Sequence, residues 1–378
     1  MATSTNTFTA CGPTNTMNTS TIVHVTAYYP PHIGGVERMA GGICKRLLGC
    51  GYAVRVLTAS AAVGTDEETP AVQRLPSFEF AHTPIAPTLI YHLYHIPKHS
   101  IIHLHLAQAY WPDCVRLIAW LRRIPYIVHF HLDVGISGPF GVLFLLYKRL
   151  TWGPLMRNAA RVIACSDAQS EVVQRIYGVH PSKIVVIANA VDDDFFTQGS
   201  VHTLHAPLRL LSIGRLVPQK RIALLLRMCT HLKVPATLTI AGDGEERAAL
   251  QHYAEAQGLP VTFVGSQNDA GMQKLHRSHD VLLSSSEKEG GTPLVVLEAM
   301  AAGLPIIAAR VSGLEELVKD VGVLVEAPYE EHLARAIEKL SEDANLYTAY
   351  CTASRSRAER YRWAEYMQRL EALYTSLV

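Results

Sequence analysis

Two cations follow a glycine directly after a predicted strand, and their spacing suits phosphate chemistry. Arg215 comes after Gly214, and Lys220 lies five residues further on, where the loop opens a helix. Most arginines and lysines are solvated surface residues, but in open α/β sheets ligands bind at the carboxyl ends of strands. Guanidinium and ammonium groups at such an end can neutralise a phosphate. The segment therefore favours an anion site over ordinary surface charge.

A glycine-rich loop before a predicted helix carries the second group of residues. The segment 284–300 reads SSSEKEGGTPLVVLEAM. Thr292 can cap this helix with Pro293 at its first position. The glycines leave the helix N-terminus open to a phosphate, where the macrodipole favours negative charge. Glu298 lies about one and a half turns inside the helix and can face the same ligand. A plain helix start with solvated carboxylates would leave the clustered glycines and Glu298 unexplained.

The first half of the chain offers two weaker candidates. Gly34 and Gly35 follow the first predicted strand and precede a helix, so they could aim backbone N–H groups at an anion or simply form a tight turn. The pattern is not G-x-G-x-x-G, which disfavours a nicotinamide enzyme. His129 and His131 project to the same side of a strand. We expect His131 at the carboxyl end, facing the cleft between domains.

Two patterns suggest metal binding, and we expect no metal at either. The pair His129 and His131 lacks a third ligand at a known spacing, and the alternative is one packed and one exposed histidine. Asp192, Asp193 and Asp194 imitate a D-x-D metal site, but they lie at the domain junction, far in sequence from the phosphate candidates. We interpret them as linker and surface charge. We also expect no cofactor.

Short β-branched runs alternate with longer helical stretches, and the pattern restarts after residue 207. This alternation predicts two doubly wound, Rossmann-like α/β domains that face a central cleft. The predicted strands are 21–26, 53–58, 101–105, 126–130, 162–164, 183–187, 208–213, 236–240, 261–264, 280–283, 305–308 and 322–325. The predicted organisation is a disordered tail (1–20), an acceptor-side domain (21–191), a linker (192–207), a nucleotide-sugar domain (208–355) and a closing helix (356–378) that packs back on the first domain.

The composition excludes several classes of protein. The chain has 34 lysines and arginines against 33 acidic residues, which gives no reason to expect a nucleic-acid partner. Seven scattered cysteines without C-x-x-C fit a reducing compartment. No apolar run approaches the length of a membrane span. We predict a cytoplasmic protein, with peripheral contact at the inner face of the membrane left open. The apolar segment 138–144 is either an acceptor groove, a membrane contact or a packed helix.

Taken together, these segments resemble the retaining GT-B glycosyltransferases of family four, the "glycosyl transferases group 1" family, from about Ile22 to the C-terminus. The stretch 289–303, EGGTPLVVLEAMAAG, looks like the family's donor signature. Gly214-Arg215 with Lys220 is similar to its GR…K pair. The junction 189–192, Asn-Ala-Val-Asp, looks like its N-G-V-D with alanine for glycine. Residues 363–374 are similar to its closing helix.

The resemblance implies a metal-independent hexosyltransferase that moves a sugar from a UDP- or GDP-sugar to a hydroxyl of a glycan, glycolipid or small metabolite. It implies front-face attack by the acceptor without a covalent nucleophile. His131 would contact the donor sugar, Arg215 and Lys220 would hold the diphosphate, Glu289 the sugar hydroxyls and Glu298 the ribose. The donor would also meet the backbone of Gly35, Gly290, Gly291, Thr292, Pro293 and Leu294.

The sequence departs from the family at one point. Eight residues separate Glu289 from Glu298, whereas the family usually has seven. Either the loop bulges so that Glu289 reaches the sugar, or Glu287 serves instead. Two other functions stay open: a GT-B nucleotide-sugar epimerase, and a non-catalytic protein that binds nucleotide sugars.

Overall fold

The chain folds into two units that are discontinuous in sequence. The computed structural model describes residues 20–60, 71–80, 83–131, 141–196 and 203–378, without the side chains of 141–144. The first unit comprises residues 1–187 together with 366–378, and the second comprises 188–365. The closing segment of the chain is therefore part of the first unit. No helix in these described stretches is long and apolar enough to cross a membrane.

The described residues of the first unit form a seven-stranded parallel sheet with the order β3-β2-β1-β6-β7-β8-β9. Its central strands are buried on both faces, which explains their continuous apolar sequences. The strands are β1 (Thr21–Val25), β2 (Ala53–Ala59), β3 (Val72–Leu75), β6 (Ser100–Leu106), β7 (Tyr126–Phe130), β8 (Arg161–Ala164) and β9 (Ile184–Val186).

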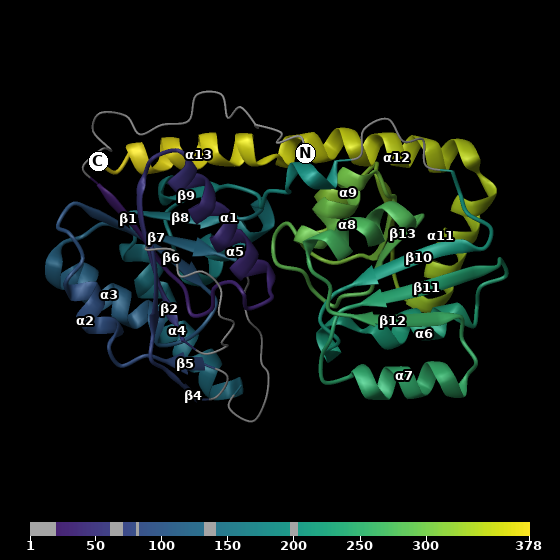
Figure 1. Ribbon diagram of the computed structural model, residues 1–378, viewed down its shortest axis with the longest axis horizontal. Coiled ribbons are helices and arrows are strands. Elements are labelled where there is room, and N and C mark those ends of the chain that lie inside the picture. The colour runs from purple at the N-terminus through teal and green to yellow at the C-terminus, as the bar shows by residue number, and fades with distance from the viewer. Residues whose placement is uncertain (1–19, 61–70, 81–82, 132–140, 197–202) are drawn as a thin grey trace, which may run out of the picture. The chain divides into compact units, whose positions relative to one another are not determined.

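Helices connect and cover this sheet (Figure 1). They are α1 (Gly35–Gly49), α2 (Leu89–Tyr94), α3 (Trp111–Arg122), α4 (Gly141–Asn158), α5 (Asp167–Tyr177) and α13 (Trp363–Thr375). A short antiparallel pair, β4 (Phe78–Phe80) and β5 (Thr83–Ile85), precedes α2. The last helix is bound firmly to this unit, because the Tyr374 hydroxyl lies 2.6 Å from Nδ1 of the buried His103 on β6.

The described residues of the second unit form a six-stranded parallel sheet with the order β12-β11-β10-β13-β14-β15. The strands are β10 (Leu208–Ile213), β11 (Ala236–Ala241), β12 (Val261–Gly265), β13 (Val281–Ser284), β14 (Ile306–Ala309) and β15 (Gly322–Val325). The helices are α6 (Ile222–Cys229), α7 (Arg247–Ala256), α8 (Asp269–Ser278), α9 (Leu294–Ala302), α10 (Glu315–Val318), α11 (Tyr329–Glu342) and α12 (Ala344–Ala358).

The strand orders give each sheet a switch point. In the second sheet the chain builds outward from β10 in one direction and then restarts from β13 in the other. In the first sheet, β1 and β6 have the same relation. Loops that leave the carboxyl ends of such strand pairs diverge and leave room for a ligand. The predicted fold class, two Rossmann-like α/β domains of the GT-B type, is confirmed.

Candidate functional site

The loops after β10 and β13 meet because these two strands are neighbours in the sheet. Lys220, at the end of the first loop, places Nζ 2.6 Å from Oε1 of Glu289 in the second. Both side chains are only partly accessible, at 23% and 11%. Two of the predicted site residues, 69 positions apart in sequence, are therefore in direct contact. Glu287 is exposed, and its backbone N–H donates to the carbonyl of Gln219.

Arg221 holds the two loops together. Its Nε donates to the carbonyl of Ser285 and its guanidinium also donates to the carbonyl of Ser286, both at 2.9 Å. In return, the Ser285 hydroxyl donates to the carbonyl of Lys220 at 2.8 Å. These bonds fix the backbone from which Lys220 projects. The sequence analysis missed Arg221, whose only signal was a third cation beside the predicted pair.

Two glycines after β11 support the loop that carries Arg215, whose side chain is exposed. Gly242 and Gly244 have φ values of 131° and 159°. A Cβ at Gly244 would lie 2.3 Å from the carbonyl oxygen of Leu216, so only glycine allows this approach. The sequence analysis missed this support too, although Gly-Asp-Gly directly after a strand was a recognisable signal.

The start of α9 differs from the prediction. The helix begins at Leu294, Pro293 is the N-cap residue, and no side chain caps it. Thr292 is therefore not the cap: its hydroxyl accepts a hydrogen bond from the backbone N–H of Asn189 at 2.8 Å, and its carbonyl accepts from the Asn189 side chain. The hydroxyl is committed to anchoring the loop. The first N–H groups of the helix still lack intrahelical acceptors, as at any helix start.

The glycines before α9 shape this loop. Gly291 is buried with a φ of 59°, in the left-handed region that glycine adopts freely, and Gly290 is partly exposed. A Cβ at Gly313 would lie 3.1 Å from the carbonyls of both Glu289 and Gly291, so a neighbouring chain segment packs tightly against the turn. The additional residue between Glu289 and the helix is accommodated while Glu289 still reaches Lys220.

Glu298 is more deeply buried than its predicted role suggests. It is 1% exposed, and its Oε2 lies 3.5 Å from Nε2 of His276 on α8, which is fully buried. Phe195 packs edge-on against the His276 ring. The sequence analysis gave no role to His276. Glu298 is on the predicted helix, but its carboxylate points into a packed interior.

In the first unit, Gly34 and Gly35 lie at the start of α1, as predicted. A carboxylate already covers this helix start: Oε1 of Glu37 lies 3.1 Å from Nδ1 of His32. The hydrogen bond from Glu37 raises the pKa of His32, and the His32 ring stacks on Tyr28 at 4.4 Å. A donor phosphate at Gly35 must share the helix start with Glu37.

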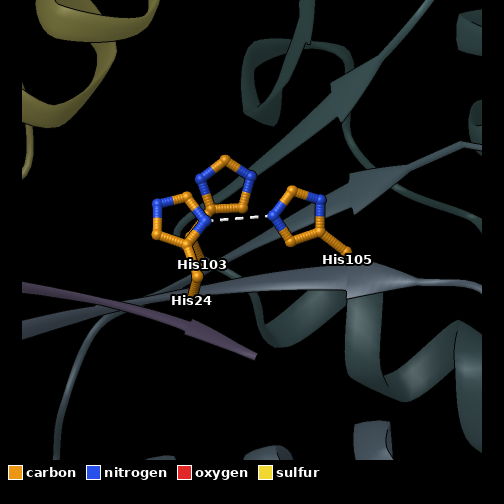
Figure 2. A group of neighbouring side chains, drawn as sticks. All are labelled: His24, His103 and His105. Atoms are coloured by element: carbon orange, nitrogen blue, oxygen red, sulfur yellow. Dashed lines mark hydrogen bonds between the residues drawn. The ribbon is translucent and has the colours of Figure 1, made fainter. Parts of the chain in front are cut away.

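His131 belongs to a cluster of five buried histidines on one face of the first sheet, together with His24, His103, His105 and His129. His129 and His131 stack at 3.9 Å, so the alternative of one packed and one exposed histidine is wrong. The sheet register explains the cluster, because His24 pairs with His103 and His105 pairs with His129. Figure 2 shows three of the rings lying together.

The backbone at His131 is fixed from α5. The Gln169 side chain donates to the carbonyl of His131 at 2.9 Å and accepts from the N–H of Cys165 at 2.8 Å. Burial lowers the pKa of His131 to about 3, so the ring is neutral at physiological pH. Its accessible surface is 7% of the full value, which is less open than expected for a residue facing a cleft.

The aspartates 192–194 are engaged within the second unit. The Asp193 carboxylate forms an ion pair with Arg362, and the carbonyl of Asp194 accepts from Arg277 at 2.7 Å. These contacts support the interpretation as junction residues. The predicted loop segments 61–70 and 132–140, which include most of the candidate acceptor regions, lie outside the described residues.

Comparison with known proteins places both halves of the chain. Residues 33–195 match the model described as Glycosyltransferase Family 4, and residues 200–357 match Glycosyl transferases group 1. The chain is 25% identical over 373 residues to a glycosyltransferase of Methanocaldococcus jannaschii, covering 90% of this chain and 94% of that one. It is 24% identical over 369 residues to a protein of the phosphatidylinositol N-acetylglucosaminyltransferase of Arabidopsis thaliana, covering 93% and 81%.

Among solved structures, the Anabaena protein HepE in complex with UDP and glucose has a TM-score of 0.76. The alignment covers 94% of this chain and 99% of that one, at 20% sequence identity. At this level of identity the likeness shows the fold.

Proposed function

The chain belongs to the glycosyl transferases group 1 family of GT-B glycosyltransferases, and from this premise we propose that it is a retaining hexosyltransferase. The donor is a nucleotide-diphosphate sugar, with UDP or GDP as the leaving group. The acceptor is a hydroxyl group of a glycan, glycolipid or small metabolite. HepE was solved with UDP and glucose, which makes UDP-glucose the first donor to test.

The contact between Lys220 and Glu289 carries this proposal. Breaking a nucleotide sugar places negative charge on the diphosphate and positive character on the anomeric carbon. Fixed cations aimed at the leaving group stabilise that charge without reorganisation. Lys220 is held by the Arg221 lock, Arg215 lies on the same loop, and α9 starts with unbonded N–H groups nearby in sequence. Glu289 beside Lys220 is suited to accept hydrogen bonds from sugar hydroxyls.

The chemistry of transfer needs no protein nucleophile. The acceptor oxygen bonds to the anomeric carbon while the bond from that carbon to the diphosphate oxygen breaks on the same face. The acceptor proton passes to the leaving diphosphate, so charge balances. In this scheme, His131 contacts the donor sugar, and the backbone of Gly35 approaches the phosphate. Glu298 is assigned to the ribose hydroxyls.

A donor panel assayed by nucleotide release, with and without candidate acceptors, tests the proposal. We expect release that depends on an acceptor, survives EDTA and yields a product with the donor's anomeric configuration by NMR. Free nucleotide without a glycosylated product would favour the epimerase. Stabilisation by UDP or GDP without turnover of any donor would favour a binding protein. Activity lost in EDTA and restored by manganese would contradict the metal-independent site.

We further propose that the first unit contacts a membrane through α2 and α3. These neighbouring helices expose apolar side chains on both, and Trp120 is 76% exposed. Residues 89–123 contain four lysines and arginines but a single acidic residue, Asp113. The Arg122 guanidinium lies 5.6 Å from the ring centre of Tyr94, linking the two helices. An apolar, aromatic surface with cationic neighbours fits an anionic lipid headgroup region.

Vesicle co-sedimentation tests this contact. We expect more binding to vesicles of phosphatidylcholine with phosphatidylserine than to phosphatidylcholine alone, and a loss of binding in Trp120→Ser with Leu121→Ser. Ile176→Ser, which changes an exposed apolar residue on α5, is the matched control and should bind as before. Equal binding by the double variant and the control would remove the proposal.

A further inference from the structure

Three imidazoles form a hydrogen-bonded chain that ends at His131. Nδ1 of His24 lies 3.0 Å from Nε2 of His105, and Nδ1 of His105 lies 2.9 Å from Nε2 of His131. The bond between His24 and His105 is the dashed line in Figure 2. All three rings are buried. Burial lowers the pKa of His24 to about 3 and that of His105 well below its usual value, so these rings are neutral as well.

Neutral imidazoles impose a direction on this chain. Each ring carries one N–H donor and one bare nitrogen acceptor. If His105 donates from Nδ1 to His131, its Nε2 must accept from His24. If His105 instead donates from Nε2 to His24, its Nδ1 must accept from His131. The tautomer of His131 is therefore coupled to that of His24, two strands away in the sheet.

The buried end of the chain selects between the two directions. Nε2 of His24 is buried and has no hydrogen-bond partner among the described residues. In one direction this atom is an N–H without an acceptor, and in the other it is a bare nitrogen. Among buried backbone groups, an unpaired N–H is rarer than an under-satisfied acceptor. The bare nitrogen at His24 is thus favoured, which directs every N–H of the chain toward His131.

At the other end, Nδ1 of His131 joins none of the hydrogen bonds formed between described residues, and His131 keeps its small exposed surface. We propose that His24 and His105 are positioning residues that hold His131 as the Nδ1–H tautomer, so that it donates a hydrogen bond to the donor sugar. The role at the sugar rests on the proposed function, whereas the coupling of the three rings does not.

The same cluster contains two groups of three histidines close enough to be compared with a metal site. The distances favour hydrogen bonds. In each bonded pair the two nitrogens face each other at 2.9–3.0 Å, which suits a shared proton. A zinc ion needs about 2.0–2.1 Å to each nitrogen, and no space for it remains between facing atoms. Zinc bound stoichiometrically at this cluster would overturn the relay.

A second chain in the cluster provides a matched control. The Tyr374 hydroxyl lies 2.6 Å from Nδ1 of His103, and Nε2 of His103 lies 3.2 Å from Nδ1 of His129. Burial raises the pKa of Tyr374 well above its usual range, so its hydroxyl keeps its proton and donates it to this chain. Tyr374→Phe removes a buried hydrogen bond from the same cluster without touching the chain that reaches His131.

The experiment measures ¹⁵N shifts of the histidine rings in the full-length protein, with His131 assigned through His131→Asn. In the wild type, we expect the Nδ1–H form of His131 to predominate by about tenfold or more, as expected for a buried hydrogen bond worth about 1.4 kcal/mol. His24→Leu should give a mixture of tautomers, and His24→Asn, which keeps a polar atom at the place of Nδ1, should restore the wild-type pattern. Tyr374→Phe should leave His131 unchanged.

Turnover separates the relay from the proposed function. With UDP-glucose or the donor identified by the panel, His24→Leu should lower kcat about three- to tenfold, the value of one hydrogen bond, with KM little changed. A tautomer shift without any change in turnover would keep the relay and remove His131 from the reaction. An Nε2–H form in the wild type, or the same tautomer in His24→Leu, would overturn the relay. The wild-type spectrum decides even if the leucine variant does not fold.

Discussion

Lys220 is the cation whose position is most tightly fixed in the candidate donor site. Its backbone is bonded to Ser285, and its ammonium group lies 2.6 Å from Glu289. Lys220→Ala should lower kcat by about 10²–10³, the usual cost of removing one fixed donor to a developing anion. Steady-state kinetics measures this loss, with Lys274→Ala, an exposed lysine on α8, as the control. Equal rates for the two variants would return Lys220 to the status of a surface residue.

Glu289 and Glu287 are separated by their surroundings. Glu289 contacts Lys220, whereas Glu287 is exposed. Glu289→Gln should spare the binding of free UDP or GDP but lower transfer about tenfold or more, because a charged hydrogen bond to the sugar is lost. Calorimetry with the diphosphate and turnover with the intact donor measure the two effects. The reverse pattern, normal transfer in Glu289→Gln and impaired transfer in Glu287→Gln, would reassign the sugar contact.

Burial raises a sharper question about Glu298. If this carboxylate binds both ribose hydroxyls, Glu298→Gln should weaken nucleotide binding about ten- to a hundredfold, because hydrogen bonds to charged groups contribute about 1.5–3 kcal/mol. Calorimetry measures the affinity, and His276→Gln, which changes the neighbouring residue, is the control. Unchanged affinity with a lowered melting temperature would make the buried pair of Glu298 and His276 structural.

At the scale of elements, the central strands were predictable because buried parallel strands have nearly continuous apolar sequences. The predicted 126–130, 208–213 and 322–325 match β7, β10 and β15 residue for residue. The edge strand β3, with the sequence Val-Gln-Arg-Leu, was missed because half of it is polar. The three-residue strands β4 and β5 and the six-residue α2 are too short to show a period.

The contacts within the site were less predictable than its elements. The run Gly-Thr-Pro suggested that Thr292 caps α9, but the cap was lost because Asn189, more than a hundred residues earlier, donates to the same hydroxyl. The histidine cluster depends on strand order: His105 and His129 meet only because β6 and β7 are neighbours in register. Local sequence patterns do not contain that information.

For the whole molecule, the buried histidines predict acid sensitivity. In an unfolded chain, a histidine takes up a proton below about pH 6.5, but burial lowers the pKa of His24 and His131 to about 3. His103, His105 and His129 are lowered further. The unfolded state therefore binds more protons between these values, and the free energy of unfolding falls as pH falls. Each group contributes at most about 1.4 kcal/mol per pH unit.

Five such groups approach about 7 kcal/mol per pH unit, comparable with the stability of a typical domain. We expect cooperative unfolding between about pH 6 and 5, followed by circular dichroism during acid titration. His24→Leu removes one proton-binding site and should make the fall in stability less steep, whereas His99→Gln, at an exposed position, should not. A free energy of unfolding that is constant from pH 7 to pH 5 would contradict this account.

The last helix has a consequence for the order in which the protein is made. Tyr374 completes the first unit by bonding to His103, 271 positions earlier, while all of 188–365 belongs to the second unit. During synthesis the second unit has its whole sequence available before the first does, although the first leaves the ribosome earlier. The early-made sheet must wait with its histidine face incomplete until the final residues emerge. A chain released a dozen residues too soon would thus lack part of the unit that was translated first.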